Sequence, residues 1–242
     1  RLKSMYLRPK AKPIMTKNNT TTSPAYHIAL EDEHGAHNYH PLPVVLSEGK
    51  GCLVWDVEGK QYFDFLSAYS AVNQGHCHPR IVDVMVEQSR KLTLTSRAFH
   101  NDQLGEYEKY LTNYFTFDKV LPMNTGAEAV ETAIKICRKW GYEKKGIPTD
   151  QARIIVCGQN FHGRTVTIIS FSSDPGAKGN FGPYTPGFES VPYGDSDAMR
   201  AALANDPATI AAVPRQPIQG QPGLPVPPAG LLPHHTHPPN PT

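Results

Sequence analysis

Residues 120–135 constrain the fold more than any other segment, because they read as a short apolar strand entering a helix through a small-residue turn. Thr125, Gly126 and Ala127 form the turn. The helix has apolar residues at i, i+3, i+4 and i+7, namely Val130, Ala133, Ile134 and Cys137. We therefore predict that one face of the helix is buried and that its N-terminus is fixed.

Such a turn can bind an anion the size of a phosphate monoester. The first helical turn leaves backbone N–H groups free at the positive end of the helix dipole, and Thr125 adds a hydroxyl. On spacing alone, an ordinary capped helix is the better reading of this segment. It has neither the Gly-Lys-Ser/Thr ending of a P-loop nor the three spaced glycines of a dinucleotide site.

Composition limits the class of protein. The chain has 242 residues, 39% hydrophobic and 19% charged, which is enough for a sizeable core in one or two domains. A net charge of +2 gives no reason to expect nucleic acid or an anionic membrane as partner. The four cysteines fall in separate segments without a Cys-x-x-Cys pair. We expect free thiols in a reducing compartment, with the cytoplasm slightly preferred to the mitochondrial matrix.

The ends of the chain look unlike its middle. We predict a polar tail over residues 1–30, and Met15 is a candidate initiator because the first residue is Arg1. No Asp, Glu or Lys follows Asp206, and ten of the 23 prolines lie in residues 214–241. We predict that residues 214–242 are a proline-rich tail, disordered or the product of a reading-frame error.

The middle of the chain, residues 31–213, alternates strands and helices. Residues 48–66 read as a β-hairpin turning at Glu58 and Gly59, and helices are predicted from Pro79 and over residues 102–115. Residues 154–157 and 166–170 read as strands, the first buried on both faces. This alternation is typical of an α/β fold with a mostly parallel sheet and flanking helices.

Four further segments surround the turn, at residues 37–41, 65–76, 94–99 and 160–165. In this order they resemble the N-terminal half of the ornithine aminotransferases, a branch of the class III pyridoxal-phosphate (PLP) enzymes, over residues 33–213. The resemblance implies a truncated large domain of the fold-type I PLP-dependent transferases. It also implies PLP as cofactor, a homo-oligomeric parent, and neither nucleic acid nor membrane as partner. The implied reaction moves the δ-amino group of L-ornithine to 2-oxoglutarate, giving glutamate 5-semialdehyde and glutamate on the route to proline.

The resemblance also implies cofactor contacts. It assigns Thr125, Gly126 and Ala127 to the PLP phosphate, and Phe161 with the adjacent His162 to the pyridine ring. A flat aromatic side chain suits a flat cofactor. Without the resemblance, a core phenylalanine at the end of a strand would be the better reading of Phe161.

Substrate contacts follow in the same way. The resemblance assigns Arg164 to a substrate carboxylate, which a planar guanidinium can bind with two hydrogen bonds, and Tyr39 and Tyr69 to the substrate side of the pocket. A surface salt bridge for Arg164 and simple packing for the tyrosines are the alternatives. His76, Cys77 and His78 are too close in sequence to be assigned as a metal site.

The resemblance fades near the C-terminus. Gln216 and Gln221 stand where the family has glutamates, and the chain ends before the family's pyridine-nitrogen aspartate and its Schiff-base lysine. We therefore assign no catalytic residue and expect this polypeptide alone to lack transaminase activity. Two alternatives stay open: another class III aminotransferase, acting on acetylornithine or 4-aminobutyrate, and a non-catalytic PLP-fold remnant that pairs with an intact subunit.

Overall fold

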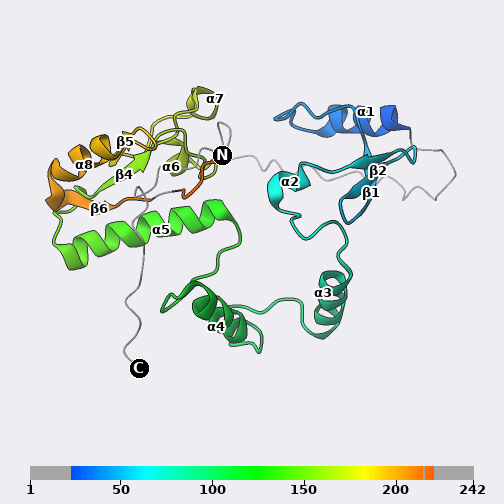
Figure 1. The fold of residues 1–242 in the computed structure, drawn as a ribbon, viewed down its shortest axis with the longest axis horizontal. Coiled ribbons are helices and arrows are strands. Elements are labelled where there is room, and N and C mark those ends of the chain that lie inside the picture. The colour runs from blue at the N-terminus through cyan, green and yellow to red at the C-terminus, as the bar shows by residue number, and fades with distance from the viewer. Residues whose placement is uncertain (1–22, 215, 221–242) are drawn as a thin grey trace, which may run out of the picture. The chain divides into compact units, whose positions relative to one another are not determined.

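The computed structural model describes residues 23–214 and 216–220. The chain divides into two compact units, Arg1–His100 and Asn101–Thr242, so the boundary falls inside the range that we predicted as one segment. Figure 1 shows the helices and strands of each unit. We describe each unit by itself.

The first unit opens with helix α1, Pro24–His34. Pro24 occupies the start of the helix, where its missing N–H costs nothing, and the Ser23 hydroxyl accepts a hydrogen bond from the Tyr26 backbone N–H. The helix Pro24–His34 thus begins inside residues 1–30, the range predicted as a polar tail. Residues 1–22, including Met15, lie outside the described residues.

A three-stranded antiparallel sheet follows, with strands β1 (Leu46–Lys50), β2 (Leu53–Asp56) and β3 (Gln61–Phe63) in that order. The predicted hairpin is confirmed between β2 and β3. Its turn contains Gly59 at a φ of +83°. The Asp56 carboxylate closes the turn by accepting hydrogen bonds from the backbone N–H groups of Glu58 and Lys60 and from the Tyr62 hydroxyl.

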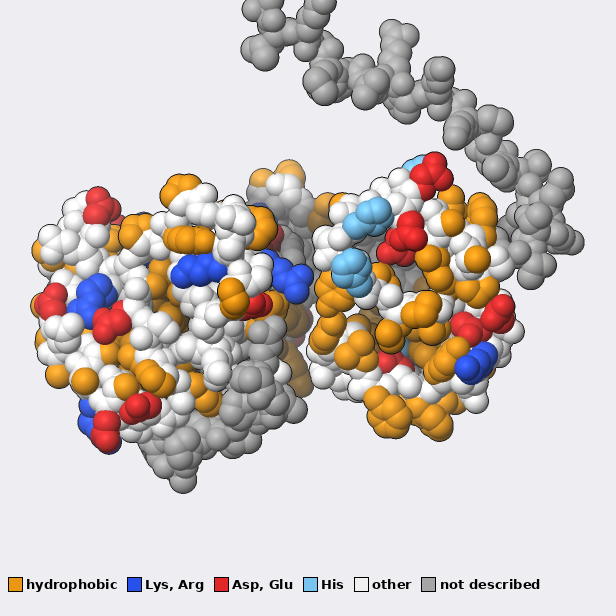
Figure 2. Space-filling view, turned by 90° about the horizontal axis from the view of Figure 1, so that it is seen from above, with side chains coloured by type: hydrophobic (Ala, Val, Ile, Leu, Met, Phe, Trp, Pro, Cys, Tyr) orange, Lys and Arg blue, Asp and Glu red, His pale blue; other side chains and the backbone are white. Residues whose placement is uncertain are grey.

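Two further elements complete the first unit: the single turn α2 (Ser67–Ser70), whose residues have left-handed instead of α-helical φ values, and the helix α3 (Pro79–Lys91). The predicted start of α3 at Pro79 is confirmed. Its apolar residues Ile81, Val82, Met85 and Val86 are exposed, as are many hydrophobic side chains of the described chain. Figure 2 shows how widely such side chains reach the surface.

The second unit begins with helices α4 (Leu104–Phe115) and α5 (Gly126–Trp140), which continues into the π-helical turn η1 (Gly141–Lys145). Both predicted helices are confirmed. The apolar strand predicted ahead of α5 is wrong, because residues 120–123 form no strand. Pro122 has no N–H to donate to a ladder, and no neighbouring strand pairs with this segment among the described residues.

A parallel sheet forms the core of this unit. Strand β4 (Arg153–Cys157) lies between β5 (Phe188–Val191) and β6 (Ile210–Ala212), and both neighbours run parallel to it. The predicted α/β class with a parallel sheet is confirmed.

Both faces of β4 are covered, as its continuous apolar sequence predicted. Ile155 packs with Met199 of helix α8 (Ser196–Ala204), and Ile154 packs with Ile134 of α5. Figure 1 shows α5 and α8 on opposite sides of the sheet. The 3₁₀ turn η2 (Pro207–Thr209) leads from α8 into β6.

Residues 166–170 contain helix α6 (Val166–Ile169), and the predicted strand is wrong. The Ile169 backbone N–H donates to the Thr165 carbonyl, and Ile168 is buried against the sheet. β-branched residues favour strands, but the two adjacent isoleucines, Ile168 and Ile169, are buried from a helix here. A second short helix, α7 (Pro175–Lys178), follows it.

Residues 216–220 fall in the range predicted as a disordered or aberrant proline-rich tail, yet they pack within the second unit. The Gln219 side chain is 1% exposed and donates to the Gly158 carbonyl. Residues 215 and 221–242, including Gln221, lie outside the described residues. Among the described helices, none is both long and apolar enough to cross a membrane.

Candidate functional site

The N-terminus of α5 is fixed by two side chains. Thr125 is the N-cap, in extended conformation, and its hydroxyl oxygen accepts from the Glu128 backbone N–H at 3.1 Å. The Glu128 carboxylate accepts in turn from the Asn124 backbone N–H at 2.9 Å. This reciprocal cap sets the first helical residue at Gly126. Ile134 is buried beneath the sheet, whereas Ala133 of the predicted apolar face is exposed.

The capped turn keeps the donors that an anion needs. No described residue accepts from the backbone N–H of Gly126 or Ala127. The Thr125 oxygen accepts from Glu128, so its O–H remains able to donate. A β-carbon placed on Gly126 would meet no atom within 4 Å, so the space beside it is open. These groups would suit a phosphate monoester, and phosphate binding at this turn stays a prediction.

Gly163 lies in the loop between β4 and α6, and it brings this loop into close contact with the start of α5. Its φ is +130°, and a β-carbon there would lie 2.9 Å from the Ala127 β-carbon and 3.1 Å from a side-chain carbon of Ile168. The Thr165 hydroxyl donates to the Glu131 carboxylate, which ties the same loop to α5 a turn further on. The loop that carries Phe161, His162 and Arg164 is thereby held at the predicted phosphate turn.

The backbone of Phe161 is fixed by Gln216. The Gln216 amide oxygen accepts from the Phe161 N–H at 3.3 Å, and its amide nitrogen donates to the Phe161 carbonyl at 2.9 Å. The Phe161 ring is 44% exposed, so it is not the core residue that the alternative reading required. The Arg164 guanidinium carbon lies 5.8 Å from the ring centroid, a cation–π arrangement.

The remaining predicted group on this loop, His162, is half-buried. Its ring meets the Phe171 ring edge-on, with centroids 5.7 Å apart. Burial lowers the pKa of His162 below the ordinary histidine value, because the charged form loses solvation. The His162 ring therefore packs beside the core, where burial favours its neutral form.

Two buried amides support the loop, and the sequence reading missed both. The Asn160 side chain donates to the carbonyls of Cys157, at 2.6 Å, and Phe171. Gln219 donates to the Gly158 carbonyl at 2.9 Å. The available signal for Asn160 was a polar residue three positions after the buried strand β4, whereas Gln219 pairs with a residue 61 positions away.

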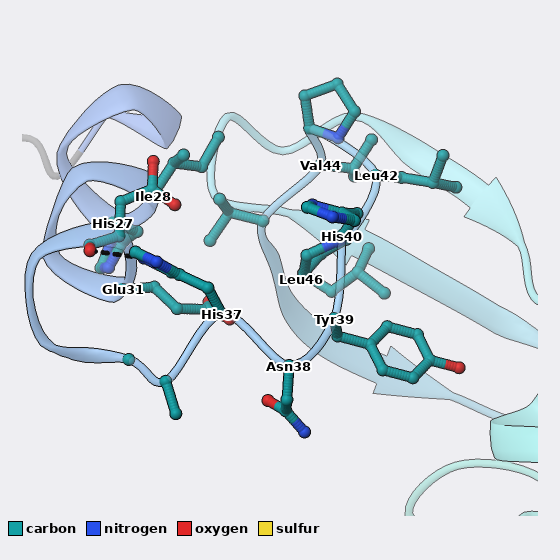
Figure 3. A pocket seen from close by; sticks show the side chains of 16 residues that line it. His27, Ile28, Glu31, His37, Asn38, Tyr39, His40, Leu42, Val44 and Leu46 are labelled. Carbon is teal, nitrogen blue, oxygen red and sulfur yellow. Dashed lines mark hydrogen bonds between the residues drawn. The ribbon is translucent and has the colours of Figure 1, made fainter. Parts of the chain in front are cut away.

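The two predicted substrate tyrosines lie in the first unit and meet each other. Their hydroxyl oxygens are 2.8 Å apart, so one phenol donates to the other. Tyr39 also lines a cavity of about 760 Å³ between α1 and residues 35–46. On the same segment, His37 contacts α1, with its Nε2 2.6 Å from the Asp32 carbonyl oxygen (Figure 3). The Tyr39 ring extends away from α1 in this view.

The chemistry of the site follows from these groups. The second unit offers an anion turn, an aromatic face and a guanidinium within one packed substructure, which suits a ligand with a phosphate and a flat ring and a second ligand with a carboxylate. No cluster of three or more His, Cys, Asp or Glu in the described part of the chain could hold a metal ion.

Known proteins with similar sequences belong to the family that the sequence motifs resemble. The family model for aminotransferase class III matches residues 34–236. The ornithine aminotransferase, mitochondrial, of Drosophila ananassae is 59% identical over 205 residues, which cover 85% of this chain and 47% of the relative. The chain thus spans about half the length of the curated relatives it matches.

Solved structures agree in fold. The ornithine aminotransferase of Toxoplasma gondii, which has PLP at partial occupancy in its active site, matches with a TM-score of 0.83 and 47% identity over 86% of this chain and 48% of its own. The acetylornithine aminotransferase of Elizabethkingia anophelis matches with a TM-score of 0.73 and 61% identity over 84% of this chain and 49% of its own.

Proposed function

Because this chain belongs to the class III aminotransferase family, we propose that it supplies the cofactor-binding and substrate-binding groups of an ornithine aminotransferase. The enzyme transfers the δ-amino group of L-ornithine to 2-oxoglutarate and yields glutamate 5-semialdehyde and glutamate. The observation that carries the proposal is the contact of Gly163 with Ala127, which places an aromatic ring and a guanidinium on one loop beside an open anion turn.

Different residues would bind the cofactor phosphate, the cofactor ring and the substrate carboxylate. Gly126 and Ala127 would donate backbone N–H groups to the phosphate of PLP, and Thr125 would add its hydroxyl. The Phe161 ring offers a flat face to the pyridine ring, and Arg164 a bidentate partner for a substrate carboxylate. PLP, when bound, supplies the electron-withdrawing ring that amino-group transfer needs. Gln216 and Asn160 keep the loop in place.

The tyrosine pair supports ornithine as the amine donor. Two phenol oxygens 2.8 Å apart can both accept from an ammonium group, which has three N–H donors. This argument concerns the α-nitrogen, which is an ammonium in ornithine. In acetylornithine the α-nitrogen is acetylated, so it carries no charge and has one N–H. The 61% identity to the acetylornithine aminotransferase nevertheless makes that activity the second candidate.

An amine-donor panel tests the proposal. The enzyme is expressed at the length of its relatives, and glutamate formation from 2-oxoglutarate is measured with ornithine, acetylornithine and 4-aminobutyrate. We expect the highest kcat/KM with ornithine, and we expect Tyr69→Phe to reduce the preference for ornithine over acetylornithine. A higher kcat/KM with acetylornithine in the parent enzyme would establish the second candidate. Absence of glutamate with every donor would exclude both.

The assembly and the compartment belong to the same proposal. We propose a homo-oligomer, in line with the family, and either the cytoplasm or the mitochondrial matrix as compartment. The four free thiols suit the reducing interior of both, and the name of the Drosophila relative favours the matrix. Sedimentation of the enzyme and fractionation of native cells, with detection of the chain in each fraction, test these two points.

A further inference from the structure

The segment that carries Tyr69 has an unusual backbone. Four consecutive residues, Ser67, Ala68, Tyr69 and Ser70, have φ values of 47°, 49°, 56° and 70°. This left-handed conformation is unfavourable for every residue other than glycine, because the β-carbon crowds the following carbonyl oxygen. The turn contains no glycine, so its surroundings must impose the conformation.

The Asp64 carboxylate holds the entry to this turn. One of its oxygens accepts from the backbone N–H groups of Leu66, at 3.0 Å, and Ser67, at 2.8 Å. At the exit, the Val72 backbone N–H donates to the Ser67 carbonyl at 3.0 Å. The left-handed turn is thus closed at both ends, and Asp64 is the side chain that fixes where it starts.

His76 in turn fixes Asp64. Its Nε2 lies 2.7 Å from the second carboxylate oxygen, and both side chains are mostly shielded from solvent, at 28% exposure for His76 and 16% for Asp64. The His76 backbone exchanges two hydrogen bonds with Gly51, and its ring is packed so closely on Gly49 that a β-carbon there would lie 2.8 Å from it. The pair is therefore anchored to the start of the antiparallel sheet.

We propose that Asp64 and His76 are positioning residues, which hold the left-handed turn so that the Tyr69 hydroxyl meets the Tyr39 hydroxyl and can face the amine donor. The role in substrate recognition rests on the proposed function. The geometric part does not, because it concerns only contacts inside the first unit.

The chain offers a matched control. Asp56 plays the same structural part at the β2–β3 turn, where it accepts from two backbone N–H groups and one side-chain hydroxyl, but it does not contact the turn of Tyr69. Asp64→Ala and Asp56→Ala thus remove equivalent carboxylates from the same unit. His76→Phe is the second test variant, because phenylalanine keeps the packing on Gly49 and cannot bond to Asp64.

The first measurement uses this chain without cofactor. The chain is labelled with 3-fluorotyrosine, and the Tyr39 resonance is followed by fluorine NMR. We expect Asp64→Ala and His76→Phe to shift this resonance in the same direction as Tyr69→Phe, because Tyr39 loses the same partner in each. We expect Asp56→Ala to leave it unchanged. An unshifted Tyr39 resonance in a folded Asp64→Ala chain would overturn the proposal, and so would unfolding of both Asp64→Ala and His76→Phe.

The second measurement uses the enzyme at the length of its relatives. We expect Asp64→Ala to raise KM for ornithine about tenfold, the equivalent of one lost hydrogen bond, and to have little further effect when Tyr69→Phe is already present. Additive effects would overturn the positioning role. An NMR shift in an enzyme that does not accept ornithine would instead reject the proposed function and leave the geometric assignment standing.

Discussion

A β-carbon on Gly163 would lie 2.9 Å from the β-carbon of Ala127, so the loop of the candidate site touches the helix N-terminus through a position that admits only hydrogen. The distance is shorter than real β-carbons approach one another. The φ of +130° at Gly163 is a second reason why only glycine suits this position, because other residues rarely adopt it. This contact joins the loop of Phe161 to the turn at Thr125, the two segments that we propose for the cofactor ring and phosphate.

We expect Gly163→Ala to lower the free energy of unfolding by about 1–3 kcal/mol, because the added methyl group both clashes and strains the backbone. Gly146→Ala is the control: Gly146 also has a positive φ, +79°, but a β-carbon there would meet nothing within 4 Å. Urea denaturation followed by circular dichroism measures both. Equal losses for the two variants would show that the contact with Ala127 contributes nothing.

Gln216 is predicted to be better at its position than the family's glutamate. Gln216→Glu loses the hydrogen bond to the Phe161 carbonyl and places a carboxylate beside that oxygen, which should cost about 1–3 kcal/mol at neutral pH. A protonated glutamate can donate again, so the loss should shrink as the pH falls. Unfolding free energies at several pH values, with Gln216→Ala for comparison, test this. A loss that does not depend on pH would contradict the assigned bond.

The first unit should lose stability in acid. The hydrogen bond from Tyr62, with those from the Lys60 and Glu58 backbone, keeps the pKa of Asp56 below its ordinary value of 3.8. A lowered pKa in the folded state stabilises above the unfolded pKa, and this contribution disappears as pH falls through the folded pKa. We expect Tyr62→Phe to flatten the pH dependence of unfolding below pH 4, and the exposed Tyr26→Phe to leave it unchanged. Identical acid profiles for the parent and Tyr62→Phe would refute the assignment.

Thiol reactivity should follow burial. Cys52 and Cys77 are exposed, Cys137 is partly buried with a pKa raised by that burial, and Cys157 is buried in β4. Because the thiolate is the reactive form, iodoacetamide should modify Cys52 and Cys77 first and Cys157 only after unfolding. Peptide mass spectrometry at increasing times gives the order. Early modification of Cys157 in the folded chain would contradict the packing of β4.

Local signals in the sequence located much of this fold. The Thr125-to-Glu128 cap, the buried strand β4 and the hairpin at Gly59 are all set by residues within a few positions of each other, so a pattern can reveal them. The apolar run of α6 failed as a signal, because burial of Ile168 and Ile169 satisfies a helix as well as a strand.

The features that sequence could not reveal depend on long-range partners. The Gln216 side chain forms hydrogen bonds with the backbone of Phe161, 55 residues away in the sequence. Nothing in the sequence of either segment indicates that the two residues pair. The left-handed turn at Tyr69 has no glycine to mark it, and its entry is held by Asp64, which bonds in turn to His76, twelve residues away.

The Gly163 contact also sets a rule for redesigning the enzyme. Every substitution there adds at least a methyl group, so this position offers no graded adjustment and is best held constant in any library. Arg164, the next residue, is exposed and meets only the Phe161 ring among the interactions described for it, so it can be varied without disturbing the helix. One loop thus contains a position that tolerates no side chain and, next to it, a residue whose substitution would alter the proposed carboxylate contact without disturbing the helix.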